Sequence, residues 1–212
     1  MPSLSGWGGF AHYASDNYKA HVVGITISKE QAALARQTCE GLPVEIRLQD
    51  YRDVTGQFDR IVCIGMVEHV GYKNYRTYMK VVDRCLRPDG LFLLHTIGQH
   101  TSQTSNDPWI HKYIFPHSMA PSSKQIAKAA EGLFMIQDWQ VFVTNYVNTI
   151  TTRYVKVTKN WDKLKDVYDE RFYRMWTCYL FTGTGVARSD TAAVWQIVFS
   201  KQGVEGGYHS IR

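Results

Sequence analysis

Cysteine is scarce in this 212-residue chain: there are four, and no two of them form a C-x-x-C pair. The sequence therefore contains no zinc or redox motif, and we expect no metal site. Long apolar stretches are missing as well, because none approaches the ~18 residues of a membrane-spanning helix. Residues 1–4 lack the charged and apolar regions of a secretion signal. We expect a cytoplasmic protein with reduced thiols.

Runs of like charge are also missing. Charged residues make up 20% of the chain and are scattered, with a net charge of +5 and no dense Lys/Arg cluster. The positive balance favours an anionic partner such as acidic phospholipid. Nucleic acid is not among the partners we expect, because no basic-aromatic motif accompanies the charge. The alternative is a mildly basic protein whose charge has no specific partner.

Hydrophobic residues make up 44% of the sequence, enough for one sizeable core, so we treat residues 1–212 as a single domain. Their spacing predicts strands at 21–27, 44–48, 58–64, 91–95 and 193–199, and a further strand within 134–143. Helices are expected at 10–18, 28–40, 74–86 and 122–131. Strands that alternate with helices favour an α/β fold with a largely parallel sheet and helices on both faces.

Three segments add detail to this alternation. Pro88-Asp89-Gly90 predicts a turn before the strand at 91–95. Residues 99–121 are polar and then aromatic and contain three prolines, so we interpret them as an insertion or lid. Aromatic and apolar residues at three- to four-residue spacing predict an amphipathic helix over 161–180.

Glycines and polar residues gather where the predicted strands end. Glycines at 6–9 precede a helix, where a ligand can approach the backbone closely. Residues 26–31 and 49–52 follow two strands, and ligands of open α/β sheets bind beyond the carboxyl ends of strands. The alternatives are structural: a simple glycine turn and a helix cap at Ser28. Asp50 could accept from an adenine amino group or cap a turn, and both stay open.

A Glu and a His follow the strand at 58–64, within residues 65–71. Glu68 and His69 at a strand's carboxyl end suggest proton chemistry or anion binding, whereas a surface pair is the simpler alternative. His95 closes the next predicted strand. A histidine there is often a satisfied core residue, but its place at the edge shared with Glu68 makes it a candidate.

Taken together, these segments resemble the cyclopropane fatty acid synthases. Each motif alone is weak, but the set is in register and in order over nearly the whole chain. The similar segments are 6–13, 23–28, 48–53, 65–71, 94–98, 107–110, 112–116 and 195–196.

The resemblance implies a Rossmann-like seven-stranded methyltransferase sheet with helical lid insertions. In the implied reaction, the methyl group of S-adenosylmethionine adds to a cis double bond of an unsaturated phospholipid acyl chain, giving a carbocation. A bicarbonate ion then removes a proton from the new methyl group, and the cyclopropane ring closes. The resemblance assigns bicarbonate to Glu68, His95 and Tyr146. It assigns cofactor contacts to Gly6, Gly8, Thr26, Ser28, Gln31, Gln49 and Asp50.

The chain also departs from the family. Family members have a lipid-binding N-terminal region and a Tyr-Ser-Cys-like segment, neither of which we find before Gly6. Residues 1–5 stand in place of a hydrophobic strand, contain a proline and are short against the ~5–6 residues of a typical strand. We therefore expect a sheet that lacks most of its first strand and little activity from residues 1–212 alone. Gly183 replaces a further family cysteine.

Two alternatives to cyclopropanation remain. One is a sister lipid methyltransferase that makes methyl-branched or hydroxylated acyl chains. Glu68, His95 and Tyr146 favour cyclopropanation over this sister reaction, because bicarbonate-assisted proton removal is the last step of cyclopropanation. The other is an inactive remnant or a non-enzymatic partner, favoured by the missing strand and cysteine. In the favoured reading the protein attaches peripherally to a membrane, and a homodimer is left open.

Overall fold

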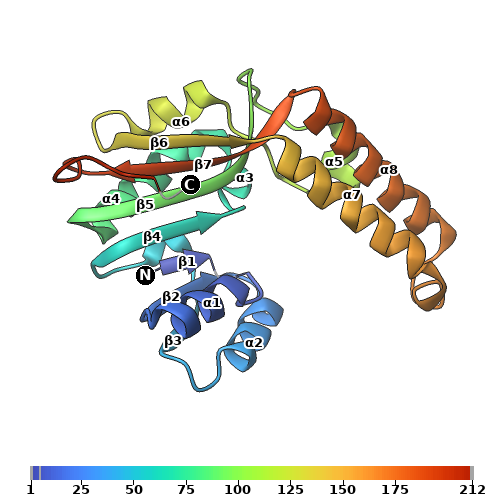
Figure 1. The fold of residues 1–212 in the computed structure, drawn as a ribbon, viewed down its shortest axis with the longest axis horizontal. Helices are drawn as coiled ribbons and strands as arrows, with labels where there is room; N and C mark the ends of the chain where they lie inside the picture. Colours follow the sequence, from blue (N-terminus) through green and yellow to red (C-terminus); the bar gives the residue numbers. More distant parts are fainter. Residues whose placement is uncertain (1, 5, 211–212) are drawn as a thin grey trace.

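A seven-stranded sheet forms the centre of the computed structural model, which describes residues 2–4 and 6–210 (Figure 1). The strand order is β3-β2-β1-β4-β5-β7-β6. Neighbouring strands are parallel except where β7 pairs with β5 and β6, so the expected largely parallel α/β sheet is confirmed. The strands are β1 Pro2–Leu4, β2 Val22–Thr26, β3 Val44–Leu48, β4 Phe58–Ile64, β5 Leu86–Gln99, β6 Met135–Phe142 and β7 Ala192–Ser200.

Helices cover both faces of this sheet. Val22 and Ile46 pack with α1 and α2, whereas Ile25 and Phe92 belong to a larger cluster with α4 and α6. Val22 and Ile25 point to opposite faces of β2, because side chains alternate along a strand. The helices are α1 Gly9–Tyr18, α2 Lys29–Thr38, α3 Val67–Val70, α4 Tyr75–Cys85, α5 Pro108–Tyr113, α6 Ser123–Ala130, α7 Thr144–Lys159 and α8 Glu170–Arg188, with short 3-10 turns η1 Tyr51–Asp53, η2 Tyr72–Asn74 and η3 Trp161–Lys163.

The first strand requires a correction to the sequence interpretation. Residues 2–4 form a short strand between β2 and β4, where most of a strand was expected to be missing. The three residues pair with β2 from Pro2↔Val23 to Leu4↔Ile25, and Ser3 pairs with Val62 of β4. The proline is tolerated because it is the first residue of the strand. The expected flanking by β2 and β4 is confirmed, but their facing backbone groups are not left wholly without partners.

The strand β5 corrects two further expectations. It begins at Leu86 and runs to Gln99, so the predicted strand at 91–95 is too short. Its pairing with β4 jumps from Phe58↔Leu86 to Arg60↔Leu91. The predicted turn at 88–90 is therefore an irregularity within the strand, and not a loop before it. His95 lies inside β5 and does not end it.

Residues 100–121 connect β5 to α6 and contain the short helix α5, as expected for an insertion. Asp107 caps α5 through its carboxylate, which accepts from the backbone of Trp109 and Ile110 at 2.9 and 3.1 Å. The segment returns to the sheet because Gln99 N donates to Pro121 O at 3.0 Å, and Met119 N donates to Glu68 O at 2.7 Å. The insertion therefore lies directly against α3.

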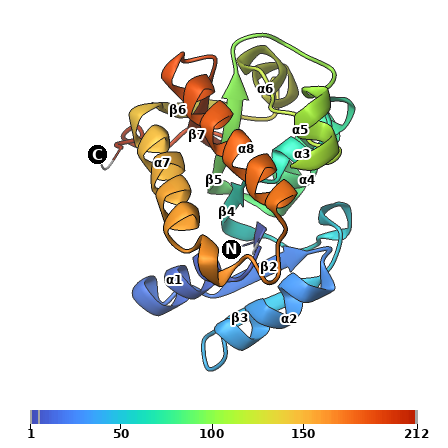
Figure 2. The same cartoon turned by 90° about the vertical axis from the view of Figure 1, so that its right-hand side faces the viewer.

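Helices α7 and α8 form an arm that extends from the sheet toward the right of Figure 1. The predicted helix over 161–180 begins too early, because Asp169 caps α8 by accepting from Phe172 N at 2.8 Å. Helix α7 was not expected from its sequence, which is rich in threonine and valine and therefore has low helix propensity. Figure 2 faces the side toward which β4 points and shows the arm in front of it.

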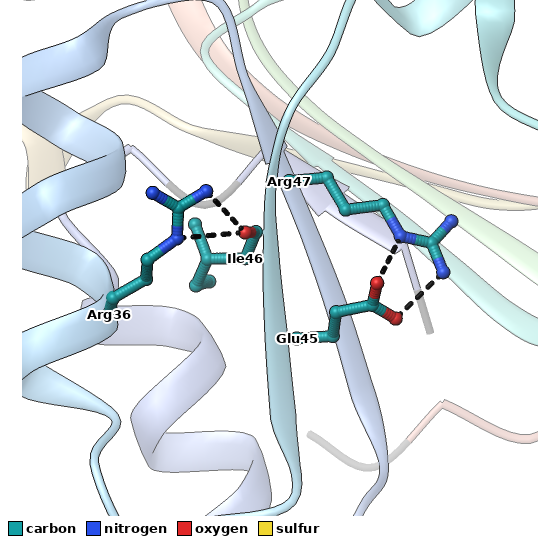
Figure 3. Close-up of polar contacts among 4 residues, drawn as sticks. All are labelled: Arg36, Glu45, Ile46 and Arg47. Carbon is teal, nitrogen blue, oxygen red and sulfur yellow. Dashed lines mark hydrogen bonds and ion pairs between the residues drawn. The ribbon is translucent and has the colours of Figure 1, made fainter.

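The sheet ends at β3, whose outer edge is partly covered by a side chain of α2. Arg36 donates from Nε and Nη2 to Ile46 O at 3.1 and 3.0 Å (Figure 3). Arg47 and Glu45 form a separate pair on the same strand, at 2.8 and 2.7 Å. By occupying a carbonyl at the free edge, Arg36 reduces the opportunity for another strand to pair there.

Candidate active site

The loop between β1 and α1 is held open by two glycines with positive φ. Gly6 has φ 45° and Gly8 has φ 91°. Residues with a Cβ rarely adopt such positive φ values. A Cβ on Gly8 would lie 2.9 Å from the Cα of Ala35, so Gly8 lets the loop pack against α2. A Cβ on Gly6 would meet nothing within 4 Å. The backbone at Gly6 is therefore accessible to a ligand, whereas Gly8 has a packing role.

Thr26, Ser28 and Gln31 form one connected network after β2. Thr26 Oγ1 donates to Gln31 Oε1 at 2.7 Å and accepts from Ser28 N at 3.2 Å. Ser28 Oγ accepts from Gln31 N at 3.2 Å, which confirms Ser28 as the helix cap. The network orients these three side chains, and their assignment as cofactor contacts stays a prediction.

Gln49 and Asp50 lie after β3, beside that network. Gln49 N donates to Thr26 O at 2.9 Å, which joins the ends of β2 and β3. Asp50 caps η1 by accepting from Arg52 N at 2.9 Å and also binds the Arg52 guanidinium at 2.8 Å. The hydrogen bond from Arg52 lowers the pKa of Asp50, opposed by partial burial. The turn-capping alternative is thus realised, and the carboxylate keeps its charge for a ligand.

Glu68 is the most unusual side chain at this edge. Its Oε1 accepts from Ile97 N at 2.8 Å, whereas Oε2 is buried without a hydrogen-bond partner among the described residues. Burial raises the pKa of Glu68, opposed by the Ile97 amide, its own amide, the Thr96 hydroxyl and His69. A buried acceptor without a donor is costly, so Glu68 Oε2 is an unusual group that requires a functional explanation.

The two other predicted catalytic residues have different relations to Glu68. Burial raises the pKa of Tyr146, a shift that the charge of Arg153 opposes and that of Glu68 adds to. His95 Nδ1 instead lies 3.2 Å from Gln196 Nε2, and burial lowers its pKa. No hydrogen bond joins Glu68, His95 and Tyr146 to one another in the described structure. Their convergence on one pocket stays a prediction.

Two residues at this edge were given no role from the sequence. Ile97 positions Glu68 through its backbone amide, and Gln196 contacts His95 from the antiparallel neighbour β7. A backbone donor leaves no signal in residue type. Gln196 belongs to a segment that resembles the family, but its pairing with His95 depends on the register of β7 against β5.

A continuous series of six aromatic rings runs from His69, next to Glu68, along the arm. Phe115 of the insertion contacts His69 and Tyr179, with ring centroids 6.4 and 5.8 Å apart. The series then follows α8, with successive centroids 5.4, 6.0 and 4.3 Å apart. Its members, called here the ring series, are His69, Phe115, Tyr179, Trp176, Phe172 and Tyr168.

The sheet order, the single reversed strand β7 and the glycine loop after β1 define a Rossmann-like methyltransferase fold. The cyclopropane synthase MmaA2 from Mycobacterium tuberculosis has this fold, with a TM-score of 0.87 and 24% identity over 94% of this chain and 77% of that chain. The mycolic acid cyclopropane synthase CmaA1, complexed with SAH and CTAB, gives a TM-score of 0.86 and 25% identity at the same coverage.

The chain belongs to the mycolic acid cyclopropane synthetase family, whose model matches residues 4–197. It is 51% identical over 207 residues to the cyclopropane-fatty-acyl-phospholipid synthase of Escherichia coli (strain K12), covering 98% of this chain and 54% of that protein. The chain thus spans about half the length of this relative. Within the part that the structure describes, no helix is long and apolar enough to cross a membrane.

Proposed function

We propose that this chain carries the catalytic site of an S-adenosylmethionine-dependent enzyme that converts a cis double bond of an unsaturated phospholipid acyl chain into a cyclopropane ring. The observation that carries the proposal is the buried, unpartnered Glu68 Oε2 at the carboxyl edge of a methyltransferase sheet. Family membership supplies the reaction class, and the name of the Escherichia coli relative supplies the phospholipid substrate.

The residues that follow β1, β2 and β3 provide an open backbone and oriented polar groups suited to binding S-adenosylmethionine. The backbone at Gly6 is open, and the N-terminus of α1 next to it favours negative charge such as a carboxylate. Thr26, Gln31 and Asp50 offer oriented polar atoms at the neighbouring strand ends. When bound there, the cofactor supplies an electrophilic methyl group. The SAH bound to CmaA1 supports this assignment by similarity.

Glu68, His95 and Tyr146 fit a bicarbonate ion, which would supply a small base. Glu68 Oε2 has no hydrogen-bond partner among the described residues, and in the proposal it accepts from the hydroxyl group of bicarbonate. The raised pKa of Tyr146 keeps the phenol protonated, so it can donate. His95 is neutral because its pKa is lowered, and a Gln196 amide donating to Nδ1 leaves the proton on Nε2. One acceptor and two donors match the polar groups of this ion.

Aromatic faces beside the site fit a reaction that develops positive charge on carbon. Phe115 and Tyr179 of the ring series lie between His69 and the rest of α8. Ring faces attract cations electrostatically and offer no strong nucleophile to trap them. The same rings present an apolar surface to an acyl chain. Peripheral contact with a membrane would bring such a chain to the site.

Two measurements test this proposal. Calorimetric titration should show S-adenosylmethionine binding to the unsubstituted chain. Methyl-labelled S-adenosylmethionine with unsaturated phospholipid and bicarbonate should give labelled cyclopropane fatty acid, at the low rate expected of residues 1–212 alone, identified by gas chromatography and mass spectrometry. Branched or hydroxylated products would assign the sister reaction instead. Absence of cofactor binding would contradict the proposal outright.

A further inference from the structure

The free end of the α7–α8 arm contains exposed apolar side chains. This arm end, residues 153–174, comprises the end of α7, η3, the following loop and the start of α8. None of its residues is fully buried, and Val167 and Tyr168 are 77% and 42% exposed. In Figure 1 it lies at the end of the arm away from the sheet. Single exposed apolar residues are common, so these two gain weight only from the charge and the aromatic rings around them.

A row of basic side chains precedes these apolar residues in the arm. Helix α7 contains three basic residues and no acidic one. Spacings of three to four residues place the row along one side of α7 and onto η3. Its members, all exposed, are Arg153, Lys156, Lys159 and Lys163. The arm end contains seven basic and four acidic residues, so its balance is positive although Asp166 and Asp169 flank Val167 and Tyr168. Of the acidic residues, Asp162 is engaged by Lys165 at 3.0 Å.

The ring series links this surface to the candidate active site. Tyr168, at the arm end, is its last member, and His69, next to Glu68, is its first. An apolar acyl chain that left a bilayer at Tyr168 could follow these rings toward α3, the helix that contains Glu68. The apolar tip, the basic row and this path coincide on one arm.

We infer that the arm end docks on the surface of an anionic phospholipid bilayer, with Val167 and Tyr168 at the interface and the basic row against the headgroups. This inference rests on the proposed function, which places the substrate in phospholipid. Lysine and arginine side chains near an anionic membrane attract it additively, and apolar side chains insert beside them. An acidic protein would match the charge, but the exposed valine and the path to Glu68 match lipid.

Vesicle co-sedimentation tests the docking directly. The probe is vesicles of unsaturated phosphatidylglycerol and phosphatidylethanolamine, with phosphatidylcholine vesicles for comparison. The double variant Lys159→Glu/Lys163→Glu should bind the anionic vesicles roughly thirtyfold more weakly than the unsubstituted chain. The matched control Lys124→Glu/Lys128→Glu changes the net charge equally on the exposed side of α6 and should bind as the unsubstituted chain does.

The apolar contact has its own pair of variants. Val167→Asp should weaken binding, whereas Leu34→Asp, at an exposed position of α2, should not. Circular dichroism should show that all variants are folded. Equal binding by the two charge variants, equal binding to phosphatidylcholine, or no vesicle binding by the unsubstituted chain would each overturn the inference.

Detergent-dispersed phospholipid separates docking from catalysis. In detergent, the Lys159→Glu/Lys163→Glu variant should transfer label as the unsubstituted chain does. The acyl chains of dispersed phospholipid are accessible without docking of the protein on a bilayer. Label transfer together with charge-independent vesicle binding would overturn the docking and leave the proposed function standing. Vesicle binding that depends on the arm end, with no cofactor binding by any variant, would support docking and contradict the proposed function.

Discussion

Helix α4, packed on the sheet, and helix α8, in the arm, differ in how their apolar residues are used. Five of the eleven residues of α4 are buried, among them Tyr78, Met79 and Val82. Only Leu180 and Ala187 are buried among the nineteen residues of α8. The sheet half is therefore expected to supply most of the folding free energy. The arm keeps aromatic side chains half-buried and accessible for a ligand or a surface.

The largest expected contrast is in stability. Phe92 is fully buried and packs against the rings of Tyr78 and Phe199, so Phe92→Ala should lower the free energy of unfolding by about 3–5 kcal/mol. Phe181, 60% exposed on α8, contacts Tyr154, and Phe181→Ala should cost about 1 kcal/mol or less. Urea unfolding measures both, and equal losses would break the comparison.

Activity should depend on Glu68, which lies where the sheet half meets the ring series of the arm. Glu68→Gln should reduce label transfer to phospholipid roughly hundredfold, because it replaces the acceptor carboxylate while Oε1 still accepts from Ile97. Glu131→Gln, an exposed position after α6, is the matched control and should leave the rate unchanged. Retained activity in Glu68→Gln would remove this carboxylate from the mechanism.

The same substitution should show a pH-dependent gain in stability. Burial raises the pKa of Glu68 above its ordinary value of 4.5. Folding therefore becomes less favourable as the pH rises from that ordinary value to the raised pKa of the folded protein. Glu68→Gln removes the buried charge, so the variant should be more stable than the unsubstituted chain at pH 7. Below the ordinary pKa both side chains are neutral and the difference should vanish. Urea midpoints at pH 4 and pH 7 provide the check.

A smaller effect separates the two glycines beside α1. Gly8→Ala should destabilise the fold by about 1–3 kcal/mol, since φ is 91° and the new Cβ would lie 2.9 Å from Ala35. Gly9→Ala meets nothing within 4 Å at the start of the helix and should be neutral or slightly stabilising. Thermal unfolding of the pair would show whether the loop is as tightly packed as the sheet behind it.

The smallest effects are expected at the edge strand β3. Arg36→Met removes two hydrogen bonds to a partly buried carbonyl and should cost about 1–2 kcal/mol. Arg47→Met removes an ion pair with Glu45 that is largely solvent-exposed, so about 0.5 kcal/mol or less is expected. A larger loss at Arg47 than at Arg36 would contradict this ranking.

Much of the sheet could be predicted because its patterns are local. Strands β3 and β4 lie at the predicted positions, and Ser28 caps α2 through its own hydroxyl. The arm was predicted less well, because α7 has weak helical propensity and acquires its structure by packing against α8. The expectation of weak activity for residues 1–212 alone stays a prediction, although β1 removes part of its structural argument.

The sequence by itself determined the α/β class, the family and the candidate residues, because each depends on residue order and short-range periodicity. Tertiary structure alone decided that residues 2–4 join the sheet, since a three-residue strand is stable only between formed neighbours. It also decided that Glu68 Oε1 meets Ile97 while Oε2 is left without a donor. Burial and the register of distant strands produce such contacts, and neither quantity is contained in any local segment.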